Sequence, residues 1–234
     1  MDIQPTVKCF GKVGVDLGIK TLATLSDGLV FPALKPYRSN KAKLAKLQRK
    51  ASKQMRDLRG NNSSANSLVK GSKNRAKTQQ KIARLHARIA NIRNDATHKL
   101  TSHLTKNHSQ IVIEDLNVSG MMKNHKLASA IADSGFYEFR RQLEYKAEWY
   151  GSEVTVIDKW YPSSQLCSGC GARQPMPLQV RLYDCSSCGL SLDRDLNAAI
   201  NIRNYSKTEV SYTLEACGRE LLGSPVEAGI RPQT

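Results

Sequence analysis

Residues 13–20 read VGVDLGIK, a short apolar run that ends in an acid and continues with leucine, glycine and isoleucine. Such a valine-rich run favours a β-strand, which would carry Asp16 at its end. Residues 21–25 (TLATL) and 29–31 (LVF) are two further β-rich runs, and Asp27-Gly28 marks a turn between them. We therefore predict three neighbouring antiparallel strands.

Two more apolar runs follow later in the chain. Residues 111–114 (IVIE) and 154–157 (VTVI) are typical of buried strands. Between them, apolar residues recur at helical spacing over 136–150, and Asp133 or Ser134 is a candidate for the cap of this helix. A strand, helix and strand after an antiparallel meander predict an α/β fold, with helices packed on a mixed sheet.

The stretch between residues 35 and 106 is strongly basic, with twenty Lys or Arg residues and only two acids, Asp57 and Asp95. Apolar residues recur within it at steps of three and four, first over 44–58 and again over 82–104. This spacing predicts two amphipathic helices that form a hairpin, with Ser39 as a candidate cap of the first.

The outer faces of this hairpin favour nucleic-acid contact over a merely solvated surface, because few acids are present to relieve the repulsion between its cations. The residues that we expect to contact nucleic acid are Lys46, Arg49, Lys50, Lys53, Arg56, Lys77, Lys81, Arg84 and Arg88.

Composition narrows the class of protein further. The chain has 234 residues and a formal net charge of +16, which indicates a polyanionic partner. No apolar run is long enough to span a membrane, and the first residues do not resemble a secretory signal, so we expect no membrane association and a cytoplasmic location. In that compartment the six cysteines are expected to be reduced or metal-bound.

Two CxxC motifs lie late in the chain, separated by fourteen residues. Their cysteines are Cys167, Cys170, Cys185 and Cys188. Four thiolates at this spacing are typical of a structural Zn²⁺ site, and a redox CxxC or two chance pairs are the alternatives. Gly171 and Gly189 each follow the second cysteine of a pair, where a tight turn needs a permissive backbone.

Three acids stand where apolar elements begin or end. Asp16 and Glu114 end predicted strands, and Asp195 lies at the start of a predicted helix. If the strands are neighbours, these carboxylates meet, and Mg²⁺ or Mn²⁺ would relieve their mutual repulsion. A pair of such ions can hydrolyse a phosphodiester. Taken singly, each acid could instead cap a helix or occupy an ordinary turn.

Three phrases together resemble the RuvC-like branch of the RNase H fold: residues 13–20 (VGVDLGIK), 113–116 (IEDL) and 193–202 (DRDLNAAINI). With the four cysteines directly before the third phrase, the chain resembles the TnpB family, also called OrfB, whose members are transposon-encoded relatives of type V CRISPR effectors. The resemblance extends from Val13 to at least Arg203.

This resemblance implies an RNA-guided DNA endonuclease, often called a transposase, that acts on DNA with a guide RNA and divalent metal. It implies that Asp16, Glu114 and Asp195 are the catalytic, Mg²⁺- or Mn²⁺-binding carboxylates and that the four cysteines bind Zn²⁺. Asp193 is then expected to cap the following helix.

Members of this family carry an N-terminal module that binds guide RNA and reads the motif beside the target. About a dozen residues precede the first predicted strand here. We therefore expect an N-terminally truncated member, which is a transposon remnant, a fragment of a longer product or half of a split system. Such a chain is either an active nuclease or an idle nucleic-acid-binding remnant that represses its own element. A DDE transposase is a third hypothesis, and the cysteines and the Asn-Ala-Ala element favour TnpB over it.

The sequence predicts six segments along the chain, in which an RNase H-like nuclease is interrupted by two insertions. They are nuclease part I (1–37), the basic helical hairpin (38–107), nuclease part II (108–162), a zinc ribbon (163–190), nuclease part III (191–206) and an irregular tail (207–234).

Overall fold

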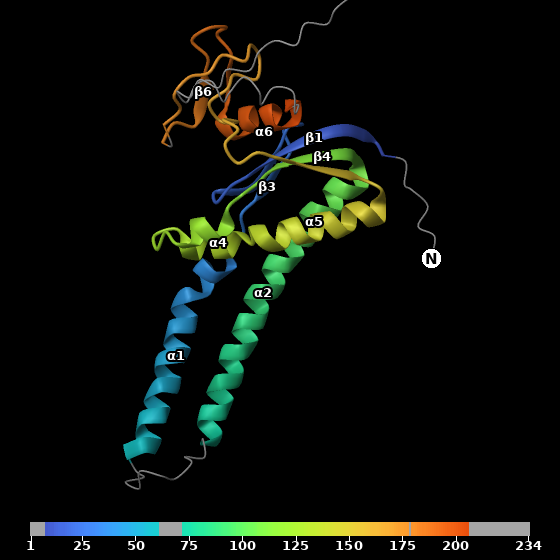
Figure 1. Cartoon of the computed structure of the whole chain (residues 1–234). Helices are drawn as coiled ribbons and strands as arrows, with labels where there is room; N and C mark the ends of the chain where they lie inside the picture. Colours follow the sequence, from blue (N-terminus) through green and yellow to red (C-terminus); the bar gives the residue numbers. More distant parts are fainter. Residues whose placement is uncertain (1–7, 61–71, 178, 206–234) are drawn as a thin grey trace, which may run out of the picture. The chain divides into compact units, whose positions relative to one another are not determined.

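A five-stranded sheet joins strands that are far apart in the sequence (Figure 1). The computed structural model describes residues 8–60, 72–177 and 179–205, with only the backbone of 56–60. The strand order is β3-β2-β1-β4-β5, and β1, β2 and β3 are antiparallel neighbours, whereas β4 and β5 run parallel to β1. The predicted meander and mixed sheet are thereby confirmed. The strands are β1 (Phe10–Leu17), β2 (Thr21–Leu25), β3 (Val30–Pro32), β4 (His108–Glu114) and β5 (Glu153–Ile157).

Helices pack on both faces of this sheet. On one face, α2 (Lys73–Asn107) and α5 (Phe136–Tyr150) cover the core, where Leu100 and Leu104 of α2 meet Phe139 and Leu143 of α5. All four side chains are at most 1% exposed. On the other face, α6 (Arg194–Asn204) contacts β1, β2 and β4. The sheet is therefore a buried layer between helices, which explains the continuous apolar runs of β1 and β4.

The predicted basic hairpin consists of α1 (Pro36–Gly60) and the first part of α2, which lie side by side in Figure 1. Leu44 of α1 packs with Leu85 and Ile89 of α2, so the apolar seam that predicted the hairpin is the contact between its helices. Ser72 caps α2, because its hydroxyl accepts a hydrogen bond from the Arg75 N–H at 3.2 Å.

Both caps that the sequence suggested at other helices are wrong. Helix α1 begins at Pro36, so Ser39 lies within its first turn, and the Asp133 carboxylate caps it by accepting hydrogen bonds from the backbone N–H groups of Tyr37 (3.0 Å) and Arg38 (3.1 Å). Helix α5 begins after Gly135, which has a φ of 68° and provides no side-chain cap.

The reason for this error is a helix that the sequence did not reveal. Asp133 and Ser134 end α4 (Ala128–Ser134) instead of starting α5, and a second short helix, α3 (Val118–Met122), precedes it. Short helices leave too few apolar repeats for their period to be recognised.

One other expectation needs correction. Strand β5 is an edge strand in which residues 154–156 are half-buried and only Ile157 is buried. His108, at the start of β4, is 2% exposed, and its ring stacks on Phe10 at a centroid distance of 5.4 Å.

The four cysteines lie in a segment that follows β5 and contains a small antiparallel sheet, β6 (Leu182–Asp184) and β7 (Ser191–Asp193). The helices and strands all belong to the first of two units of the chain, Met1–Asn204, the second being Tyr205–Thr234. The predicted irregular tail and Cys217 lie outside the described residues. Within the described part, no helix combines the length and the apolar character that crossing a membrane requires.

Candidate active site and metal centre

Asp16 and Glu114 come together through the register of β1 and β4. Val15 pairs with Ile113 in parallel strands, so the next residue of each strand, Asp16 and Glu114, reaches a neighbouring position. Val15 and Ile113 point into the core under α2 and α5. Because side chains alternate along a strand, both acids belong to the opposite face, on which α6 packs.

Gly14 allows α6 to approach this face closely. A Cβ atom at Gly14 would lie 2.1 Å from the carbonyl oxygen of Ala199 and 2.4 Å from the amide nitrogen of Arg203, both in α6. Ala198 and Ala199 of α6 are both buried, with exposures of 3% and 0%. Small residues on both elements thus let the helix that carries Asp195 lie directly against the strand that carries Asp16.

Asp195 occupies the first turn of α6. The carboxylate of Asp193 accepts hydrogen bonds from the N–H groups of Asp195 (2.9 Å) and Leu196 (3.1 Å), so the prediction that Asp193 caps this helix is confirmed. The Asp193 carboxylate is therefore engaged with the start of the helix, which carries Asp195 in its first turn.

The pKa of Asp16 reports the charges around it. Burial, followed by the negative charges of Glu114 and Asp195 and a smaller effect of Asp193, raises this pKa to about 8, against the opposing charge of Arg194. Burial also raises the pKa of Glu114, against the opposing effect of a hydrogen bond from Ser163. We call Asp16, Glu114 and Asp195 the carboxylate cluster, because they lie on neighbouring strand ends and on the helix that packs against them, and because the charges of Glu114 and Asp195 raise the pKa of Asp16.

The carboxylate cluster does not by itself form a ready metal-binding group. Among the residues that the structure describes, only the four cysteines form a group of three or more side chains that could hold a metal ion, and their sulfur atoms lie within 4.8 Å of one another. An oxygen of Glu114 instead accepts a hydrogen bond from the Ser163 hydroxyl, and Asp195 Oδ1 lies 3.7 Å from Arg181 Nη1. Ser163 and Arg181 are contacts that sequence reasoning missed, since no motif marks either residue.

Cys167, Cys170, Cys185 and Cys188, here called the cysteine cluster, lie in the arrangement that their spacing predicted. Two sulfur–sulfur distances are 3.5 Å (Cys167 to Cys188) and 3.6 Å (Cys170 to Cys185). A tetrahedral zinc ion with Zn–S bonds of about 2.3 Å places its sulfurs about 3.8 Å apart. The donor set therefore fits a tetrahedral metal such as zinc.

Local backbone geometry builds each half of the cysteine cluster. The N–H groups of Gly171 and Gly189 donate to the carbonyl oxygens of Cys167 (2.9 Å) and Cys185 (3.0 Å), and both glycines have a φ of 75°. That φ lies in the left-handed region, which side chains disfavour. Backbone N–H groups of Cys188 and Ser187 lower the pKa of the Cys185 thiol to about 6, whereas, against the backbone N–H of Leu190, hydrogen bonds with the other cysteines raise the pKa of Cys188 to about 12, so the thiols share their protons.

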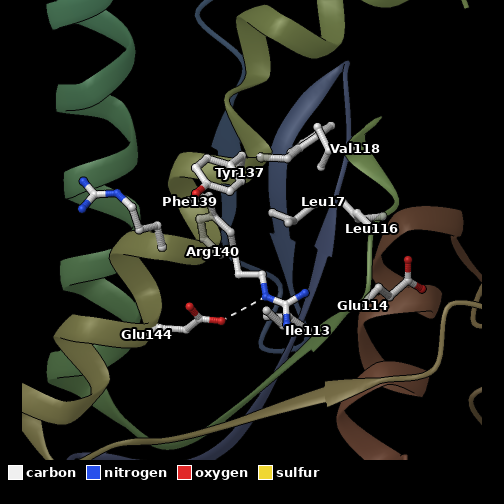
Figure 2. Close-up of a pocket in the computed structure, with 11 residues that line it drawn as sticks. Leu17, Ile113, Glu114, Leu116, Val118, Tyr137, Phe139, Arg140 and Glu144 are labelled. Atoms are coloured by element: carbon white, nitrogen blue, oxygen red, sulfur yellow. Dashed lines mark hydrogen bonds and ion pairs between the residues drawn. The ribbon is translucent and has the colours of Figure 1, made fainter. Parts of the chain in front are cut away.

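A cavity of about 320 Å³ opens beside Glu114, with apolar walls from β1, β4 and α5 (Figure 2). Arg140 lines it and forms ion pairs with Asp115 (2.6 Å) and Glu144 (3.0 Å). Tyr137, 73% exposed, lies at the same cavity. The sequence did not predict this cavity, in which the Arg140 guanidinium is already paired with two acids.

The cationic side chains predicted on the hairpin are exposed to solvent. Eight of the nine are exposed, and none of these eight forms an ion pair with an acid in the part of the chain that the structure describes. The ninth, Arg56, lies in α1, and its side chain is outside the described residues. The eight residues are Lys46, Arg49, Lys50, Lys53, Lys77, Lys81, Arg84 and Arg88.

Comparison with known proteins identifies the family. Residues 2–125, more than half of the chain, match OrfB_IS605, described as "Probable transposase", and residues 136–202 match the "Cas12f1-like, TNB domain". The chain belongs to the OrfB_IS605 family, as the resemblance to TnpB predicted.

Two relatives bear the names "Putative RNA-guided DNA endonuclease", from Streptomyces pristinaespiralis, and "Putative RNA-guided DNA endonuclease InsQ", from Escherichia coli (strain K12). The first is 43% identical over 99% of this chain and the second 39% identical over 88% of it. The chain spans about half the length of these curated relatives, 50% in each case.

Solved structures agree with the fold. The protein in "Cryo-EM structure of the Cas12f1-sgRNA-target DNA complex" superposes with a TM-score of 0.52 at 16% identity, over 82% of this chain and 49% of that one. At this identity the likeness supports the mixed α/β fold.

Proposed function

We propose that this chain is the nuclease part of an RNA-guided DNA endonuclease, with a RuvC-like active site formed by Asp16, Glu114 and Asp195. The observation that carries the proposal is the convergence of two strand ends and one helix start, in which Glu114 and Asp195 raise the pKa of the buried Asp16. The names of the relatives, which describe RNA-guided DNA endonucleases, support the same assignment.

The chemistry of the donor set supports Mg²⁺ or Mn²⁺ as the cofactor. Buried carboxylates that repel one another are stabilised by a hard divalent cation, which prefers oxygen ligands. When bound, one or two such ions supply activation of the attacking water and stabilisation of the leaving oxygen of a phosphodiester. Asp16, Glu114 and Asp195 would hold such an ion, and its positive charge would favour the ionised form of the buried Asp16 carboxylate.

The cysteine cluster has a different role in this proposal. Four cysteines fill the coordination sphere of zinc, so the bound ion has no open position for a substrate and acts as a structural element. The segment around it, which we assign as a zinc ribbon, has a small core formed by Tyr183 between Cys167 and Cys185. A core of this size needs the metal for most of its stability.

The basic hairpin is the proposed binding surface for guide RNA and target DNA. Eight exposed cations without partner acids among the described residues favour contact with phosphates. The structure similar to this chain contains an sgRNA and a target DNA, which supports both partners.

Cleavage of single-stranded DNA tests the proposed activity. The purified chain, with any RNA that co-purifies, is expected to cut a labelled strand when Mn²⁺ is added, and Asp16→Ala is expected to reduce the rate at least a hundredfold. The matched control is Asp115→Asn, because Asp115 is an exposed neighbour of Glu114 that pairs with Arg140. Equal cleavage by the wild type and Asp16→Ala would overturn the proposal.

The second candidate function is a nucleic-acid-binding protein without cleavage activity. The favouring observation is that Glu114 and Asp195 each already contact another side chain. This function predicts binding to DNA or RNA that weakens steeply with salt, with no cleavage in Mg²⁺ or Mn²⁺. Replacing Lys46, Arg49, Lys81 and Arg84 together by glutamine should reduce the salt dependence, and an unchanged dependence would exclude the hairpin as the binding surface.

A further inference from the structure

Two asparagines of α6 are buried against the segment that leads into the cysteine cluster. Asn197 is 0% exposed and Asn201 is 5% exposed, and they lie four residues apart on one face of the helix. A buried amide that lacks hydrogen-bond partners is costly, so these side chains are expected to have defined contacts.

Their contacts fix the backbone on both sides of Cys167. Asn197 donates to the carbonyl oxygen of Leu166 at 2.7 Å and accepts from the N–H of Ser168 at 3.0 Å. Asn201 donates to the same Leu166 carbonyl at 2.7 Å and to the carbonyl of Ser163 at 2.8 Å. The first cysteine knuckle is thus attached to α6 by side-chain amides and not by apolar packing alone.

The same segment contacts the carboxylate cluster at its other end. Ser163 is 7% exposed, and its hydroxyl donates a hydrogen bond to Glu114 of β4. Cys167 is therefore connected to Glu114 through the short chain segment 163–167 and the hydrogen bond of Ser163. Helix α6 provides a second connection between the cysteine cluster and the carboxylate cluster, because Asp195 lies two residues before Asn197.

We propose that Asn197, Asn201 and Ser163 are positioning residues that make the placement of Glu114 and Asp195 depend on metal in the cysteine cluster. This inference rests on the proposed function. Metal holds the two knuckles together and keeps residues 163–168 in place, so that the amides of α6 and the Ser163 hydroxyl keep their partners. Without metal, the segment loses its anchor, Ser163 leaves Glu114, and the first turn of α6 loosens.

Hydrogen–deuterium exchange gives a readout that does not depend on activity. We expect that removing the metal from the full chain with a chelator accelerates exchange at residues 163–168, and also at 112–116 and 195–201, while residues 80–90 of the hairpin do not change. Faster exchange confined to residues 163–190 would overturn the coupling.

Mn²⁺ affinity, measured by electron paramagnetic resonance, tests whether Ser163 positions the carboxylate of Glu114. Ser163→Ala is expected to weaken the Asp16-dependent Mn²⁺ site by roughly three- to tenfold, the usual worth of one hydrogen bond. Zinc content should not change, and Ser163→Thr, which keeps the hydroxyl, should restore the affinity. Ser164→Ala is the matched control, because Ser164 lies next in the chain and is half-buried.

Asn201→Ala is expected to weaken the same Mn²⁺ site and to accelerate exchange at residues 112–116, whereas Asn204→Ala, an exposed change on the same helix, is not. Unchanged Mn²⁺ affinity in both Ser163→Ala and Asn201→Ala would show that the proposed positioning is wrong. If the wild type binds no Mn²⁺ through Asp16, the proposed function fails instead, and the exchange experiment still decides the coupling.

Discussion

In the cysteine cluster, all four sulfur atoms lie within 4.8 Å of one another, whereas the oxygens of the carboxylate cluster do not form such a group. The cysteines come from two tight turns, each closed by its own backbone hydrogen bonds. The three acids come from β1, β4 and α6, elements far apart in the sequence that contact one another only in the folded chain. A site made of local turns is thus arranged by the backbone, while the proposed site of distant charges would need a cation to draw its ligands together.

From this difference between the two clusters, we expect the loss of one cysteine to destabilise the fold more than any other substitution considered below. Cys185→Ser is expected to abolish stoichiometric zinc and to unfold residues 163–190, because a structural zinc contributes on the order of 10 kcal/mol to the folding of such a segment. Zinc content by mass spectrometry and proteolysis of the segment measure the result. Cys9→Ser is the control, since Cys9 is exposed and separate from the cluster. Full zinc content in Cys185→Ser would contradict the assignment.

Asp16→Asn is expected to change metal binding and stability in opposite directions. The folded-state pKa of Asp16, about 8, lies above the value of about 3.9 in an unfolded chain, so metal-free protein loses stability as pH rises between these values. The side-chain amide introduced by this substitution does not ionise, so the variant does not lose stability in this way as pH rises. Metal-free Asp16→Asn should therefore be more stable than the wild type at pH 7.5, by on the order of 1 kcal/mol or more, and should not bind Mn²⁺. Denaturant unfolding and Mn²⁺ titration test both, and a less stable variant would contradict this explanation.

Gly14→Ala is expected to weaken metal binding at the carboxylate cluster and to leave the cysteine cluster unchanged, because it changes only the distance between α6 and β1. The added methyl group would meet the backbone of α6, so the helix must move away from β1, at a cost of roughly 1–3 kcal/mol. Mn²⁺ affinity should fall while zinc content stays constant. Gly11→Ala is a matched control in the same strand, because a Cβ there has no atom within 4 Å. Equal Mn²⁺ affinity in both variants would show that the distance between α6 and β1 does not matter.

The smallest predicted effect concerns a titratable group outside both clusters. Burial lowers the pKa of His108, so the folded protein favours the neutral ring. Its contribution to stability is present above the unfolded pKa of about 6.5 and is lost as pH falls below it. His108→Leu should therefore lose less stability than the wild type between pH 7.5 and 5.5, measured by thermal unfolding. His86→Leu, at an exposed position of α2, should behave like the wild type.

Features with a local or periodic signal could be predicted from the sequence. The strands around Asp16 and Glu114 are apolar runs, the hairpin has an apolar seam, and the cysteines and their glycines follow a fixed spacing. The cap formed by Asp193 was also predictable, because it lies directly before the helix that it caps.

Features made by tertiary contacts could not be predicted in this way. Asp133 caps a helix that begins 97 residues earlier, at Pro36, and only the packing of α4 against α1 brings it there. Ser163 is an ordinary polar residue in the sequence, and the phrase 193–202 that contains Asn197 and Asn201 does not reveal which groups their amides bind. Their roles depend on the groups that the fold places beside them. The burial of His108 likewise depends on neighbours that are distant in the sequence.

Helix α2 has a consequence for protein engineering, because it runs without interruption from the hairpin into the core and passes directly into β4 at His108. No loop separates the basic surface from the strand that ends at Glu114. Removing seven residues from the hairpin part of both α1 and α2 takes out nearly two whole turns and shortens the hairpin by about 10 Å. Leu100 and Leu104 would then keep their orientation toward the sheet, so compact versions of this protein are best designed in seven-residue steps.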